Sequence, residues 1–335
     1  PPRGKHRREE IPAFSLRQYR LGIKTTKLEK GSPSGASFFH IKIYTDFICY
    51  QYFNKKEVFF MAAHNQVRVL GYLLSDPAIY EDETGDAKIY LAIRACNRAV
   101  DGYPDSSFQD LLIFYDGASE DHNRDKLMTR LKSLVAYDLV DIKGVINVLS
   151  VNKPSICPSC GEKNVKVFGV SCFIYPITVI KLDGLQASAD YDEKIPERIL
   201  QEHYLEVSND VDVVGTVVSD PEIVAGLKYP CCRYRLAVDR KYYIKTQDSI
   251  YVDHPWVYSY GKQGKNDMKY LQPGAVVFVS GFLRNRNVLN NITCQNCDTE
   301  YQFEDIATEI IPYSVEYMRN YKWDDEIDEK NLYCQ

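Results

Sequence analysis

The chain has no apolar run long enough to cross a membrane, since its densest apolar stretch, residues 38–53, is interrupted by Lys42 and Asp46. No signal peptide with a small-residue cleavage site is recognised, so we expect a cytoplasmic protein with no membrane partner. The six histidines are scattered singly. The motifs G-x-x-x-x-G-K-[ST], H-E-x-x-H and G-x-S-x-G do not occur. Nothing in the sequence calls for catalysis, and we expect a protein that is not an enzyme.

The charge is distributed unevenly along the 335 residues. Residues 1–60 carry 12 Lys and Arg against 5 Asp and Glu, whereas the remainder carries 29 against 41. An acidic body argues against phosphate binding over the whole surface, so a nucleic-acid-binding face must be local. The 26 tyrosines indicate strands and an aromatic binding surface.

The segment Lys55–Met61 (KKEVFFM) is unusual when it is translated back into codons. Lys-Glu-Val can be encoded by a strong bacterial ribosome-binding sequence, which two further codons separate from the start codon of Met61. We interpret residues 1–60 as a disordered leader or a mis-assigned translation start, because they lack a clear period and the strand pattern starts just after Met61. The alternative is a real basic arm that contacts nucleic acid.

The rest of the chain repeats one order of elements. Val69–Tyr80 (VLGYLLSDPAIY) recurs as Val213–Val224 (VVGTVVSDPEIV), and Ile89–Ala95 recurs as Tyr234–Arg240. Each copy predicts three strands, a helix, a strand, a hairpin and a last strand. Five strands with a helix between the third and fourth is the order of an OB-fold, a small barrel that binds single strands on one face. We therefore predict a mainly β protein with two tandem OB-fold barrels.

This pattern predicts domain boundaries and helices. The first helix is amphipathic, with Leu127, Leu131 and Leu134 on one face, whereas residues 261–271 are too rich in glycine for more than one helical turn. A further short helix is expected after Pro196. The predicted segments are the leader 1–60, the first barrel 61–184, a linker 185–208, the second barrel 209–321 and an acidic tail 322–335.

Two C-x-x-C pairs fall at the same place in the two copies, in the hairpin between strands four and five. Ten cysteines without an export signal indicate metal binding and not disulfides. A structural zinc ion needs four ligands, and each turn supplies two. We predict zinc-ribbon-like hairpins that share one structural Zn2+, held by Cys157, Cys160, Cys294 and Cys297.

Two alternatives remain open for these cysteines. Each hairpin could hold its own metal, with Cys172 as a further ligand in the first copy and Cys231 or Cys232 in the second. The four thiols could also bind no metal. One zinc per chain that is lost with either pair would support the shared site.

Four segments resemble the bacterial single-stranded DNA-binding protein family. They are Gln66–Pro77 (QVRVLGYLLSDP), Ile89–Ala99 (IYLAIRACNRA), Ser106–Gly117 (SSFQDLLIFYDG) and Leu139–Val148 (LVDIKGVINV). The likeness covers most of residues 64–183 and recurs more weakly in 211–318. It implies an OB-fold and non-catalytic, largely sequence-independent binding of single-stranded DNA in replication, recombination or DNA transfer.

The chain departs from this family in three ways. It carries two barrels where family members usually have one, so a homodimer would provide four barrels. The common bacterial members of the family lack the C-x-x-C hairpins. A relative with such hairpins would suit a plasmid, phage or conjugative element as its source. The tail Trp323–Gln335 is acidic, like the segment that recruits replication or recombination proteins, but lacks the final Pro-Phe of the family.

Binding of a single strand needs flat rings for the bases and cations for the phosphates. Candidates in the first copy are Tyr72, Tyr90, Arg94, Arg98, Phe108 and Phe114. Candidates in the second are Arg233, Arg235, Arg240, Tyr242, Trp256, Tyr258, Tyr260, Phe282, Arg284 and Arg286. For any single ring the alternative is core packing. Two other functions stay open: an RNA-binding OB/zinc-ribbon protein, and a protein–protein adaptor without nucleic-acid binding.

Overall fold

A computed structural model describes residues 64–81, 83, 87–103, 107–117, 124–162, 165–182, 194–225, 229–240 and 252–323. The predicted leader, Tyr242 and most of the predicted tail lie outside the described residues. All described elements belong to one structural unit, Ala62–Gln335. No helix within the described ranges is long and apolar enough to cross a membrane.

The first five-stranded barrel (barrel 1) closes on itself. Antiparallel pairing joins β1 to β3, β3 to β4, β5 to β6 and β1 to β5, and a parallel contact between β4 and β6 completes the ring. The strands are β1 (Asn65–Leu73), β3 (Ala87–Cys96), β4 (Phe108–Asp116), β5 (Leu139–Ser155) and β6 (Val165–Lys181), with β2 (Ala78–Glu81) paired to β3. This is the OB-fold topology that the strand order predicts.

The second barrel (barrel 2) repeats these pairings strand for strand, including the parallel contact between β11 and β13. Its strands are β7 (Asn209–Val217), β9 (Cys231–Asp239), β11 (Trp256–Tyr260), β12 (Val276–Thr293) and β13 (Glu300–Arg319), with β8 (Glu222–Ile223) and β10 (Val252–Asp253) paired to β9. Every second residue of β7 is buried, because successive side chains point to opposite faces of a strand. The prediction of two tandem OB-fold barrels is confirmed.

The two barrels share a continuous sheet. β1 pairs with β7 in antiparallel register from Asn65↔Val213 to Val69↔Asn209. Buried apolar residues of both barrels form one connected core. The domain limits at 184 and 209 stay a prediction.

Three helices accompany the barrels. α1 (Arg124–Lys132) directs Leu127 and Leu131 into the core together with Leu134, as predicted. α2 (Lys194–His203) contains Pro196 in its first turn, where a missing N–H costs nothing. The expected helix near Pro196 is therefore present.

The prediction of at most one helical turn in residues 261–271 was wrong, because α3 spans Gly261–Tyr270. Gly264 allows the helix to pack so closely that a Cβ atom there would collide with the carbonyl oxygen of Ser259. The buried Asp267 accepts hydrogen bonds from Gln263 Nε2 (2.7 Å) and the Tyr317 hydroxyl (2.6 Å). These tertiary contacts outweigh the low helix propensity of glycine.

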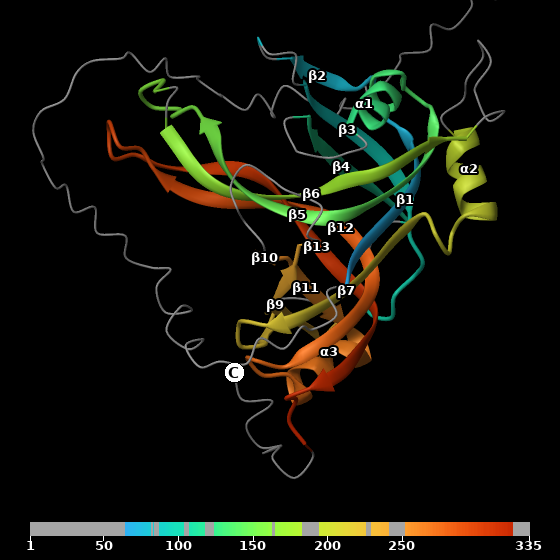
Figure 1. Cartoon of the computed structure of the whole chain (residues 1–335). Coiled ribbons are helices and arrows are strands. Elements are labelled where there is room, and N and C mark those ends of the chain that lie inside the picture. Colours follow the sequence, from blue (N-terminus) through green and yellow to red (C-terminus); the bar gives the residue numbers. More distant parts are fainter. Residues whose placement is uncertain are drawn as a thin grey trace, which may run out of the picture. The chain divides into compact units, whose positions relative to one another are not determined.

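Two long hairpins extend beyond the barrels. Arm 1 is the outer part of β5–β6 (residues 147–162 and 165–173), and arm 2 is the outer part of β12–β13 (residues 285–308). In Figure 1 they leave the barrels on the same side and run next to each other. Each arm reaches the other barrel: Val148 N donates to Asp253 Oδ1 (2.7 Å), and Asn285 Nδ2 donates to the carbonyl oxygen of Asp110.

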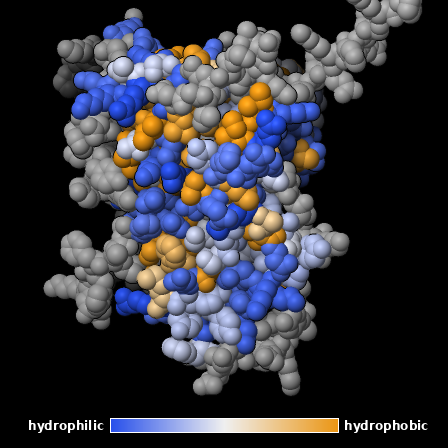
Figure 2. All heavy atoms as spheres, turned by 90° about the vertical axis from the view of Figure 1, so that its right-hand side faces the viewer, coloured by the Kyte–Doolittle hydropathy of each residue, from blue (hydrophilic) through white to orange (hydrophobic). Residues whose placement is uncertain are grey.

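The face shown in Figure 2 is largely hydrophilic, with separate small apolar patches between the charged and polar side chains. Exposed apolar residues of the described chain include Ile79, Ile180 and Ile195. Scattered exposure of this kind is ordinary for a protein surface. This face therefore does not indicate an apolar docking site.

Candidate metal centre and nucleic-acid interface

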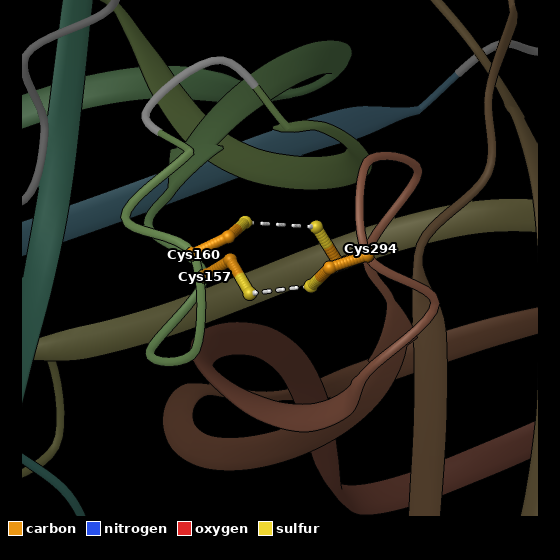
Figure 3. Close-up of side chains that lie close together, drawn as sticks. Cys157, Cys160 and Cys294 are labelled. Carbon is orange, nitrogen blue, oxygen red and sulfur yellow. Dashed lines mark hydrogen bonds between the residues drawn. The ribbon is translucent and has the colours of Figure 1, made fainter.

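The tips of the two arms bring four thiols together. The Sγ atoms of Cys157, Cys160, Cys294 and Cys297 all lie within 4.8 Å of one another. Cys157 Sγ is 3.6 Å from Cys297 Sγ, and Cys160 Sγ is 3.7 Å from Cys294 Sγ. Figure 3 shows the side chains of the two turns pointing toward each other. The shortest contacts therefore connect one arm to the other.

Each C-x-x-C turn has the same backbone geometry. Gly161 N donates to Cys157 O (2.9 Å), and Asp298 N donates to Cys294 O (2.9 Å). Both donors adopt a left-handed conformation, with φ of 69° at Gly161 and 54° at Asp298. Glycine has no Cβ penalty there, and aspartate is among the few residues that tolerate this region. The two copies of the repeat thus form equivalent turns, and each turn directs two sulfur atoms toward the other turn (Figure 3).

The two thiols of arm 2 differ in pKa. A backbone hydrogen bond from Asn296 opposes the shift at Cys294, but burial and hydrogen bonds with Cys297 and Cys157 raise the pKa of its thiol to about 11. The Thr299 hydroxyl, 3.3 Å from Cys297 Sγ, and the Thr299 backbone lower the pKa of the Cys297 thiol to about 6. A thiolate is the form that binds metals. Four thiolates in one group are the donor set of a closed structural metal site, with no open position for a substrate.

The other cysteines that we considered as ligands lie elsewhere. Within the described ranges, the group that could hold a metal contains neither Cys172 nor Cys231 nor Cys232. The geometry supports the shared arrangement over one site per hairpin.

Barrel 2 presents cations and an indole on the outer face of β9 and β11. Arg235 lies opposite Trp256 across the two strands, and Arg233 lies opposite Tyr258. The guanidinium carbons of Arg233 and Arg235 are 5.4 and 5.9 Å from the centre of the Trp256 ring. The side chain of Arg233 is 41% exposed and reaches Glu222 at 2.7 Å. This arrangement leaves the indole flanked by positive charge.

Next to this group lies an ion triad on β12 and β13. Glu309 bonds both Arg284 and Arg286, and the latter contact is 2.9 Å from Nε to Oε1. Although burial opposes it, the charge of Glu309 raises the pKa of Arg284. Arg286 stays 41% exposed, whereas Arg284 is buried and donates to the Tyr260 hydroxyl (2.9 Å). Of the two predicted arginines, Arg286 is the one available to a ligand.

A segment of barrel 1, residues 97–103, covers the part of this face that contains Tyr260 and Phe282. The Tyr103 ring lies 5.1 Å from Tyr260 and 5.5 Å from Phe282, centre to centre. The Arg98 guanidinium lies 3.9 Å over the Tyr313 ring. Tyr260 and Phe282 thus pack against protein in this structure.

On the corresponding outer face of barrel 1, the aromatic side chains are buried and the arginine is paired with carboxylates. Tyr90 and Phe114 stack with ring centres 4.8 Å apart and are only 6% and 7% exposed. Arg94 bonds Asp110 (2.7 Å) and also Glu197 of α2 (3.2 Å). Its cation is therefore shared by two carboxylates.

The remaining candidates are distributed as follows. Tyr72 is buried and donates to Glu197 (3.4 Å), and Phe108 packs against the same apolar cluster. Arg240 is buried in an ion pair with Asp253, the residue that holds arm 1. Glu309 was missed by sequence reasoning, although alternation along its strand places it on the outer face beside Trp256.

Comparison with family models matches residues 208–309 to the Single-strand binding protein family. No curated protein matches the chain. Among solved structures, a deletion mutant of the single-stranded DNA binding protein from Thermus aquaticus is 15% identical with a TM-score of 0.49, over 79% of this chain and 100% of that chain. The wild-type Thermus aquaticus protein is 14% identical with a TM-score of 0.47, over 77% and 94%. A small single-stranded DNA-binding protein from Streptomyces coelicolor is 18% identical with a TM-score of 0.23, over 32% and 93%.

The family match agrees with the resemblance found in the sequence, but it falls on the second repeat. There the strand motifs predicted the weaker likeness. The matched segment begins just before β7 and ends within β13, so it contains the second barrel except for the end of its last strand. Barrel 2 is therefore the part of this chain that matches the single-strand binding protein family.

Proposed function

We propose that the chain binds single-stranded DNA without catalysis and largely without sequence preference. The observation that supports this most is the half-buried Trp256 on the outer face of barrel 2, whose ring centre lies 5.4 and 5.9 Å from the guanidinium carbons of Arg233 and Arg235. A base can stack on the indole while the arginines contact the flanking phosphates. Stacking contributes about 1–3 kcal/mol per base and is indifferent to base identity, since every base has a π face.

The surface ion pairs on this face are compatible with phosphate binding. Arg233 pairs with Glu222, whose side chain is 52% exposed. Such exposed pairs are worth at most about 1 kcal/mol, so a phosphate can replace the carboxylate. Because binding would release counterions, affinity should fall as salt rises.

We further propose that the four cysteines hold one structural Zn2+. A tetrahedral site with Zn–S bonds of about 2.3 Å separates its sulfurs by about 3.8 Å. The cross-arm distances of 3.6 and 3.7 Å are close to this value, and much longer than the roughly 2.05 Å of a disulfide. When bound, the metal would supply a crosslink between the arms and no reactive position.

Titration with oligo-dT tests the DNA-binding proposal. The chain has two tryptophans, Trp256 and Trp323, so a Trp323→Phe variant leaves Trp256 as the only indole reporter. We expect quenching of its fluorescence that weakens with added salt. Tighter binding of a matched RNA oligomer would favour the RNA-binding alternative, and no change at low salt would favour the protein adaptor.

Four finer proposals rest on the family resemblance alone. They are a role in replication, recombination or transfer of DNA, a mobile genetic element as source, recruitment of partners by the acidic tail, and a homodimer with four barrels. Sedimentation of the full chain tests the last one.

A further inference from the structure

We propose that the two barrels differ in function: single-stranded nucleic acid binds along the outer face of barrel 2, and the equivalent face of barrel 1 does not bind it. This inference rests on the proposed function and adds to it which barrel is used. Two barrels made by duplication would otherwise be expected to bind alike. The difference follows from comparing equivalent positions.

The strand registers define these positions without any sequence alignment. β1 pairs Tyr72 with Arg94 where β7 pairs the equivalent Thr216 with Ala237. Counting back along β3 and β9, the pair Tyr90 and Phe114 corresponds to Arg233 and Tyr258, and the pair Ala92 and Leu112 corresponds to Arg235 and Trp256. On the last two strands, Asn147 pairs with Phe173 where barrel 2 pairs Arg284 with Glu309.

The charge at these six positions differs between the barrels. Barrel 2 has three arginines and one glutamate, a formal net charge of +2. Barrel 1 has tyrosine, alanine, leucine, asparagine and two phenylalanines at these positions, a formal net charge of 0. A phosphate backbone is attracted by the first set and not by the second.

The availability of rings differs as well. In barrel 1 Tyr90 and Phe114 stack on each other, and Phe173 packs on Phe114 with ring centres 5.6 Å apart. All three are nearly inaccessible, and Phe173 is 3% exposed. In barrel 2 Arg233 and Glu309 replace two of these rings, and Trp256 stands where barrel 1 has Leu112. The Trp256 ring is half-buried beside the guanidinium groups of Arg233 and Arg235.

The nearest cation of barrel 1 does not compensate. Arg94 is held by Asp110 and by Glu197, which α2 brings from the segment between the barrels. The segment 97–103 in turn extends from barrel 1 onto barrel 2, where Arg98 N donates to the Tyr313 hydroxyl (3.0 Å). Barrel 1 thus contacts barrel 2 through residues 97–103, next to the outer face that carries Trp256.

Arg233 and Lys88 provide the test, because each is a partly exposed cation on the outer face of the equivalent strands β9 and β3. Anisotropy titrations of labelled oligo-dT with wild type, Arg233→Ala and Lys88→Ala at several salt concentrations compare the two faces. We expect Arg233→Ala to weaken binding by about three- to tenfold and to reduce the salt slope by about 0.7, the value for one phosphate contact on a single strand. Lys88→Ala should stay within about twofold of wild type.

Other outcomes separate the two claims. Absence of binding by the wild-type chain removes the proposed function itself. The proposal that only barrel 2 binds the strand is contradicted by equal losses of affinity in both variants or by a larger loss in Lys88→Ala. It is also contradicted if neither variant loses affinity while the wild type binds. If Arg233→Ala is misfolded by circular dichroism, Arg235→Gln on the outer face of barrel 2 and Tyr90→Phe on the outer face of barrel 1 form a second pair with the same expected contrast.

Discussion

Cys157 and Cys297 lie 140 residues apart in the chain, yet their sulfur atoms are 3.6 Å apart across the tips of the two arms. Among the described side chains, Ile292 and Tyr301 pack against the cysteines at this junction. A hydrogen bond between Ser155 and Tyr301 (2.6 Å) adds one polar contact. A metal bound by the four thiols would add a crosslink between the two arms.

We expect metal analysis of the purified chain to find one zinc per molecule. Cys157→Ser and Cys294→Ser should each abolish it, because each turn supplies half of the ligands. Cys172→Ser is the matched control and should retain the metal, since Cys172 is outside the cluster. Two zinc ions per chain, or one that persists in Cys294→Ser, would contradict a shared site.

Replacement of Trp256 by alanine should weaken oligo-dT binding by about five- to a hundredfold, the equivalent of roughly 1–3 kcal/mol for one stacked base. Trp323→Ala is the control, because Trp323 lies after the end of β13, where its ring contacts Tyr321. The measurement is a dissociation constant at fixed salt for both variants. An unchanged constant for Trp256→Ala would mean that the strand binds elsewhere.

Gly264→Ala should destabilise the protein, contrary to the usual gain of about 1 kcal/mol for this change inside a helix. The added Cβ would collide with the carbonyl oxygen of Ser259, which is rigid backbone. We expect a loss of about 1–3 kcal/mol, the range for overpacking in a close-packed core. Lys265→Ala, at the exposed next position, should be nearly neutral. Urea unfolding measures both, and a Gly264→Ala variant more stable than wild type would refute the packing explanation.

The stability of α3 should depend on pH through Asp267. Burial raises the pKa of this carboxyl above its usual value near 3.8, with opposing hydrogen bonds from Ser259 and Tyr317. A raised folded-state pKa favours the protonated form, so its contribution is present at low pH and declines as pH rises through that pKa. Asp267→Asn, which is uncharged, should therefore gain stability over wild type at pH 7.

Thermal unfolding between pH 4 and pH 7 measures this difference. We expect the melting temperature of Asp267→Asn to exceed that of wild type by a few degrees at pH 7 and the gap to shrink toward pH 4. Asp239→Asn, at an exposed position, is the control and should show no such trend. A gap that widens on acidification would reverse the assigned direction of the shift.

The barrels themselves could be predicted because their signals are local. Alternation along β7, glycine at equivalent bulges and a strand order found twice do not depend on what packs around them. Gly144 and Gly281, for example, occupy the same bulge, where a Cβ atom would collide with the backbone of the neighbouring strand. The repeated C-x-x-C turns belong to the same class, since each turn forms within a few residues.

The availability of the site residues could not be predicted. Arg240 and Arg286 have the same charge and the same strand context in the sequence, yet Arg240 is buried against Asp253 and Arg286 is exposed. Arm 1 also contacts Asp253, the ion-pair partner of Arg240, through the backbone N–H of Val148, which lies 92 positions before Arg240 in the chain. Burial depends on such distant segments.

The amino-acid sequence by itself determined two OB-fold barrels, their order, and two turns that each aim a pair of thiols outward. Only the tertiary structure decided that these four thiols meet, that a glycine-rich segment forms α3, and that one barrel face is open while its equivalent is closed. The physical reason is the range of the interactions. Strand alternation and turn geometry are set between neighbours in the chain, whereas accessibility, charge compensation and cross-arm contact are set by residues that folding brings together from far apart.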